Sequence, residues 1–140
     1  MTGNFRAAPL APVSWGELLD KITILEIKAD RIADPADRAN VGRELALLRE
    51  VAGPVLPQPG LAPLMDGLRR VNLALWDIED DIRACEAAAR FDAQFVALAR
   101  SVYLTNDERA ALKRRINALL RSDLVEEKCH APAGRADRTR

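Results

Sequence analysis

A row of polar residues recurs along one segment of the chain and could form one wall of a binding site. Asn72, Glu79 and Glu86 lie seven residues apart, and Trp76 and Arg83 flank them. On an α-helix this spacing places the whole row along one side. Amide, carboxylate and guanidinium groups beside an indole ring can hold a small polar molecule. We therefore take this row as a candidate site.

A second group of polar residues lies in the last amphipathic segment. Arg109 and Lys113 fall on the same side as the apolar residues of that segment, so their long side chains can lie along the core and still reach water. If the two segments are neighbours, Glu79 or Asp80 could pair with these cations. Two interpretations stay open, namely an ion-pair network at the edge of the core and a pocket for an anionic ligand. The candidate ligand-binding residues are Asn72, Trp76, Glu79, Arg83, Arg109, Lys113 and Asn117.

Other chemistry has weaker support in the sequence. Asp77 and Asp81 share a helix face and offer the oxygen ligands that magnesium prefers, but such pairs are typical of a solvated acidic face. Cys129 and His130 supply two soft ligands where a structural zinc site needs four. The chain contains no phosphate-binding loop, dinucleotide fingerprint or nucleophile elbow. We assign no metal site, no cofactor and no catalytic residue, and the expectation favours a protein that is not an enzyme.

The composition fits one cytoplasmic domain. The chain has 140 residues, of which 49% are hydrophobic and only 4% aromatic. Its 21 basic residues balance its 21 acidic residues, so net charge gives no argument for nucleic acid or an anionic membrane. The basic run in the last segment lacks interleaved aromatic residues, and nucleic-acid binding is not favoured. The start of the chain does not have the pattern of a signal peptide, and no apolar stretch is long enough to span a membrane.

These side chains depend on helices for their positions, and the longest helix has the clearest pattern. Its apolar residues follow one another at spacings of three and four, which is a heptad repeat held for about four heptads. This pattern predicts a long helix over about residues 61–89. The apolar residues of the repeat are Leu61, Leu64, Leu68, Val71, Leu75, Ile78, Ile82, Cys85 and Ala89.

Capping residues predict the other helices. Ser14 with Glu17 forms a capping box that starts the first helix, and Asp34 with Pro35 ends it and starts a second helix that runs to about residue 52. In that helix Val41, Leu45, Leu48 and Val51 are expected to point inward. Residues 53–60 contain three prolines and are expected to form an extended connector.

The last part of the bundle is predicted as two helices. A short helix covers residues 92–103, and Thr105 with Glu108 caps a separate fifth helix. We therefore expect an all-α, single-domain bundle of about five helices, with the first, third and fifth forming the core. Residues 1–12 are expected to be a flexible arm, 13–127 the bundle and 128–140 a disordered tail.

The first helix is apolar on two sides. Leu18, Ile22 and Leu25 form one stripe, whereas Ile24 and Ile27 lie on nearly the opposite side. Such a helix either sits centrally in the bundle or meets another subunit. The leading expectation is a non-enzymatic interaction or scaffold protein that forms a homodimer and could also bind a protein partner. The alternative is a protein or enzyme that binds an anionic small molecule between the long helix and the last helix.

Several sequence segments resemble those of a bacterial family of small, all-helical proteins of unknown function. They are Val-Ser-Trp-Gly-Glu-Leu-Leu-Asp-Lys-Ile-Thr-Ile-Leu, within residues 12–28, and Asn-Asp-Glu-Arg-Ala-Ala-Leu-Lys-Arg-Arg-Ile-Asn, residues 106–117. Residues 75–81 and 126–128 add to the likeness, which covers about residues 12–128. The resemblance implies a fold and a bacterial source but no reaction. The family ends with Ser-Tyr after Glu-Glu-Lys, where this chain has Cys129 and His130.

A looser resemblance involves residues 18–25, which are similar to the opening helix of all-α chorismate mutases. That family binds a dicarboxylate with arginines and lysines from several helices. Pro35 ends the first helix of this chain early, whereas that family uses one long uninterrupted helix. The residues that the resemblance would place in the cationic role are Lys21, Lys28, Arg31, Arg109 and Lys113.

Overall fold

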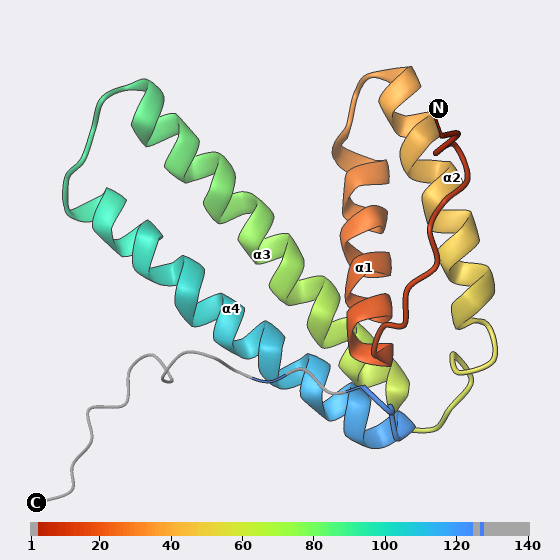
Figure 1. Ribbon diagram of the computed structural model, residues 1–140. Helices are drawn as coiled ribbons and strands as arrows, with labels where there is room; N and C mark the ends of the chain where they lie inside the picture. The colour runs from red at the N-terminus through yellow and green to blue at the C-terminus, as the bar shows by residue number, and fades with distance from the viewer. Residues whose placement is uncertain (1–2, 125–126, 128–140) are drawn as a thin grey trace, which may run out of the picture.

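The computed structural model describes residues 3–124 and 127 and shows an all-α protein that forms a single four-helix bundle (Figure 1). The expected tail at 128–140, with Cys129 and His130, lies outside the described residues. No helix within the described ranges is long and apolar enough to cross a membrane. The four helices are α1 (Trp15–Arg31), α2 (Pro35–Ala52), α3 (Leu61–Ala87) and α4 (Ala93–Leu120).

The helices form two hairpins that meet at one end and lean apart at the other. Helices α1 and α2 make one hairpin, and α3 and α4 make the second, so that the two hairpins resemble a V in Figure 1. The start of α1, the start of α3 and the end of α4 gather at the closed end. Helix α1 packs against all three other helices, which is the first of the two placements that its two apolar faces allowed.

Side-chain caps begin α1, α2 and α4, and the sequence predicted those of α1 and α2. The Ser14 hydroxyl accepts a hydrogen bond from the backbone N–H of Glu17 at 3.1 Å. The Asp34 carboxylate accepts from the N–H of Ala36 at 2.8 Å, with Pro35 at the first helical position. These side chains satisfy donors that have no partner inside the helix.

The prediction of two separate helices after residue 92 is wrong. Helix α4 runs unbroken from Ala93 to Leu120 and passes through Thr105, the expected cap of a fifth helix. A capping residue starts a helix only where the preceding chain has left the helical path. The residues of α4 before Thr105 include neither glycine nor proline. A break there would have exposed four unpaired carbonyl groups, so the helix continues.

The connector between α2 and α3 also differs from expectation. Residues 53–60 are not extended but form hydrogen-bonded turns, with the Val55 N–H bound to the Ala52 carbonyl at 3.0 Å and the Gln58 N–H bound to the Val55 carbonyl at 2.9 Å. The fixed φ of proline suits the second position of such turns. Gly60 closes the connector with a φ of +88°, a conformation that costs glycine little.

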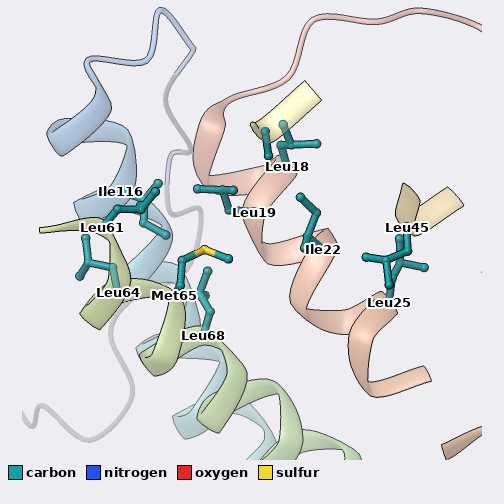
Figure 2. Packing of buried hydrophobic residues seen from close by; sticks show 11 residues of the cluster. Leu18, Leu19, Ile22, Leu25, Leu45, Leu61, Leu64, Met65, Leu68 and Ile116 are labelled. Atoms are coloured by element: carbon teal, nitrogen blue, oxygen red, sulfur yellow. The ribbon is translucent and has the colours of Figure 1, made fainter. Parts of the chain in front are cut away.

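The hydrophobic core lies where the two hairpins meet (Figure 2). One face of α1 packs there against the first half of α3 and the last turns of α4, and Leu45 reaches it from α2. Val51 is exposed although an inward position was expected, because it lies about 90° from the centre of the stripe that Val41, Leu45 and Leu48 form. The largest buried apolar residues are Leu18, Leu19, Ile22, Leu25, Leu45, Leu61, Leu64, Met65, Leu68 and Ile116.

The heptad helix was predicted correctly, but only its first half is deeply buried. Leu61, Leu64, Leu68 and Val71 are buried, whereas α1 and α2 do not cover the second half. We call the outer halves of α3 and α4, residues 73–106, the arm. Cys85 is the only buried residue of the arm. The seam between α3 and α4 continues there without a third layer.

A close approach of two helices requires glycine at position 16. Gly16 faces α4, and a Cβ atom there would lie 2.6 Å from the Lys113 carbonyl oxygen and 2.9 Å from Asn117 Oδ1. The first of these contacts involves backbone, which cannot turn aside as a side chain does. Gly42, in the middle of α2, is exposed, and a Cβ atom added to it would meet no atom within 4 Å apart from its chain neighbours and the backbone of its own helix.

We expect Gly16→Ala to destabilise the fold and Gly42→Ala to leave it intact or stabilise it. The first change forces α1 away from α4 and should cost about 1–3 kcal/mol. The second adds only helix propensity and should gain about 0.5–1 kcal/mol. Urea unfolding followed by circular dichroism at one protein concentration measures both. Equal stability of the two variants would contradict the close approach.

Candidate functional site

A buried carboxylate joins three helices at the base of the V. Asp20 of α1 is 1% exposed, and its two oxygens accept hydrogen bonds from the Arg109 guanidinium of α4, with Nε at 2.9 and 3.1 Å. Asn72 of α3 donates from Nδ2 to the same carboxylate at 2.9 Å and to the Thr23 hydroxyl at 2.8 Å. Thr23 in turn donates to the Asp20 carbonyl at 2.7 Å. We call these four residues the Asp20 network.

The pairing of this network follows from the cost of burying charge. An ionised carboxylate removed from water is unfavourable unless a counter-charge and hydrogen bonds replace its hydration. Arg109 supplies both with two parallel N–H groups, which is the geometry in which guanidinium binds carboxylate best. The network therefore fixes how α1, α3 and α4 lie relative to one another.

The carboxylates that pair with Arg109 and Lys113 differ from the expected ones. Lys113 is buried and donates to Glu17 of α1 at 2.7 Å, with Asp20 at 3.9 Å. Glu79, which the sequence suggested as a partner for Arg109 or Lys113, binds Arg83 one turn along α3 at 2.9 Å. Both α1 carboxylates lie on its second face, the face that also carries Ile24 and Ile27.

Asn117 has a structural role at the closed end of the V. Its Oδ1 accepts the backbone N–H of Gly16 at 2.7 Å, and Ser122 Oγ accepts the N–H of Trp15 at 3.3 Å. These are donors of the first turn of α1 that no residue of α1 can satisfy. Asn117 is buried, and its Nδ2 has no hydrogen-bond partner among the described residues. It joins two helix ends and does not line the pocket described next.

A pocket of about 500 Å³ opens above the Asp20 network, between α1 and the arm. We call it the central pocket. Ile24, Ile27 and Lys28 of α1 face it from one side, and Leu75 of α3 and Val102 of α4 from the other. Lys113 lies outside it and lines a smaller cavity of about 200 Å³ with Asn106 and Arg109. Five of the seven predicted site residues line the central pocket, namely Asn72, Trp76, Glu79, Arg83 and Arg109.

Sequence reasoning missed most of the polar residues that α1 contributes. Asp20 and Thr23 were not among the predicted residues, and Lys28 was named only by the chorismate mutase resemblance, although a signal for Asp20 exists. Asp20 precedes Ile24 by four residues and Ile27 by seven, so it belongs to the second apolar face of α1. A carboxylate on such a face must find a buried partner on another helix.

One carboxylate of the acidic run on α3 and two cations of α1 form ion pairs outside the central pocket. Asp77 pairs with Arg31 at 3.2 Å, and the part of the chain that the structure describes holds no group of three or more potential metal ligands. Lys21 pairs with Glu44 of α2 at 3.2 Å. Lys21 and Arg31 therefore do not join Lys28 and Arg109 around one ligand, as the chorismate mutase resemblance would require.

A second ion-pair group lies on the side of α1 that faces α2. Glu26 binds Arg69 of α3 at 3.0 Å and Arg49 of α2 at 3.5 Å. The hydrogen bond from Arg69 to Glu26 raises the pKa of that guanidinium above its ordinary value. Because these groups are partly exposed, the pairs contribute little to stability.

Comparison with protein families, with curated proteins and with solved structures gives no match. What stands of the family resemblance is that the protein is small and all-helical.

We expect Asp20→Asn to destabilise the protein far more than Asp66→Asn. The first change removes the negative charge from a buried ion pair with Arg109 and should cost about 3 kcal/mol, the lower end for a buried pair because Arg109 is partly exposed. Asp66 forms an exposed pair with Arg69 at 3.0 Å, and its loss should cost less than about 1 kcal/mol. Urea unfolding at one protein concentration gives both values, and similar losses would show that the network does not hold the helices together.

Proposed function

We propose that the protein is a non-enzymatic interaction or scaffold protein that forms a homodimer, with the arm as its interface. The observation that carries the proposal is the composition of α4 within the arm. Residues 93–106 contain one charged side chain, Arg100, although 30% of all residues in the chain are charged. A helix that lies open to water is normally rich in charge.

Exposed apolar side chains of α4 and of the turn before it lie in the same region. Phe91, in the turn, is 58% exposed, and Val96 and Tyr103 of α4 are 54% and 47% exposed. Val96 and Tyr103 are seven residues apart and share one side of the helix, with Arg100 beside them. Tyrosine, phenylalanine and arginine are enriched at protein interfaces, whereas lysine and glutamate, absent from residues 93–106, are depleted there.

The stability of the arm also argues for a covering partner. Most helix stability in proteins comes from packing of an amphipathic face against other elements, and a pair of helices alone buries little apolar surface. Cys85 is the single buried residue of residues 73–106. A second layer of helices over α4 would complete the packing that α1 and α2 give to the inner halves.

A second copy of the chain is the simplest partner of this face. A two-fold interface brings the same surface together from both chains and must be complementary to itself. A face with one charged residue meets that condition, because few like charges are brought together. Ile24 and Ile27, which suggested the dimer at first, line the central pocket instead.

Membership of the bacterial family that the sequence resembles, and a cytoplasmic location, belong to the same proposal. The family likeness rests on the phrases within residues 12–28 and 106–117. The location rests on Cys85, a buried free cysteine of the kind found in reducing compartments.

The dimer is tested by placing charge on the α4 face. We expect the wild-type protein to have a mass twice 15.4 kDa by light scattering during size-exclusion chromatography. The double variant Val96→Asp/Tyr103→Asp should have the mass of one chain, with unchanged helix content. The control is Leu47→Asp, which changes an apolar residue of α2 that is 61% exposed and lies outside the arm.

Two results would refute the proposal. One is a wild-type protein that stays monomeric at all concentrations. The other is a dimer that Leu47→Asp dissociates as readily as the double variant, because the interface would then lie on α2 or be unspecific.

A further inference from the structure

We infer that the central pocket binds a small organic anion with a flat apolar body, such as an aromatic carboxylate. This inference does not rest on the dimer, because the pocket is lined by α1, α3 and α4 of one chain. Its volume of about 500 Å³ lies within the range of pockets that hold small ligands. The shape and chemistry of its lining define the ligand class.

The apolar part of the pocket fits a flat ring. Ile24 and Ile27 of α1 are half-buried, as are Leu75 and Trp76 of α3 and Val102 of α4. These side chains lie on both sides of the pocket and leave apolar surface accessible from the solvent. The indole of Trp76 adds a planar surface on which another ring can stack.

The charges around the pocket favour an anion. Its lining contains three cations, Lys28, Arg83 and Arg109, against one carboxylate, Glu79. Glu79 pairs with Arg83, and Asp20 behind the pocket pairs with Arg109. Lys28 is then the lining cation that makes no ion pair with any residue in 3–124. A bound carboxylate would give Lys28 a partner.

The same arrangement disfavours other ligands. A cationic ligand would face the three positive groups of the lining, and the one carboxylate of the lining already pairs with Arg83. A free inorganic anion would gain from Lys28 but leave the apolar walls exposed to water, and those walls supply most of the contact surface. An anion that lacks a ring is therefore expected to bind weakly.

The experiment follows the side-chain N–H signals of the two tryptophans by NMR. The chain has only Trp15 and Trp76, and Trp15 lies at the closed end of the V, away from the pocket lining. The variant Trp15→Phe assigns the two signals. The probes are naphthoate, the uncharged naphthalenemethanol and inorganic phosphate.

We expect naphthoate to shift the Trp76 signal and leave the Trp15 signal in place. Naphthalenemethanol should bind about tenfold more weakly, as the loss of one charge-assisted contact implies, and phosphate alone should cause no saturable shift. Lys28→Gln should weaken naphthoate binding by about tenfold and remove the difference between the two ring probes. The control Lys21→Gln, in the exposed pair with Glu44, should leave both affinities unchanged.

Three outcomes would overturn the inference. If naphthoate does not shift the Trp76 signal, the central pocket does not bind this class of ligand. Equal affinity for naphthoate and naphthalenemethanol in the wild type removes the anion preference. If phosphate binds as tightly as naphthoate, the ligand does not need a flat apolar body. Because both lysine variants keep most of the length of the side chain and change exposed or half-exposed positions, the fold should survive in each.

Discussion

The buried carboxylate of Asp20 is the constraint on which the arrangement of the helices depends. A charge at that position is tolerable only where Arg109 of α4 and Asn72 of α3 reach it together, so α1 can lie in one register against both helices. One turn nearer the closed end, Gly16 allows the α1 backbone to approach α4, and Asn117 accepts its N–H. Polar contacts thus close the V at its base, and the apolar core packs around them.

Much of the fold is predictable from local patterns, because caps and heptads act within one segment. Ser14, Asp34 and the repeat of α3 were located correctly, since each reflects the satisfaction of backbone groups or the burial of one helix face. Thr105 misled the prediction for the same reason. Its side chain can cap a helix, but whether the chain has left the helix before Thr105 is decided by the packing of α4 along α3, which no local pattern records.

The lining of the central pocket was predictable in part. Trp76 and Glu79, which line it, were singled out because they lie beside a seam of period seven, and residues beside a seam stay at the edge of the core. Asp20 was missed because its meaning comes from Arg109, 89 residues away in sequence. The second apolar face of α1 pointed to a second subunit, yet in one chain it serves two purposes. Its first turns carry the carboxylates that bind α4, and its later turns line the central pocket.

The opening of the V follows from a change of residue type along α3. Below Asn72 the residues of α3 that approach α1 include Met65 and Leu68, which pack tightly in the core. Beyond Asn72 the same side carries Trp76, Glu79 and Arg83. Closing the helices over these residues would bury an ion pair whose groups are now hydrated, at a cost that the additional apolar contact does not offset. The helices therefore separate where this side of α3 becomes charged, and the apolar side chains of α1 and α4 that remain beside Trp76 become the walls of a pocket.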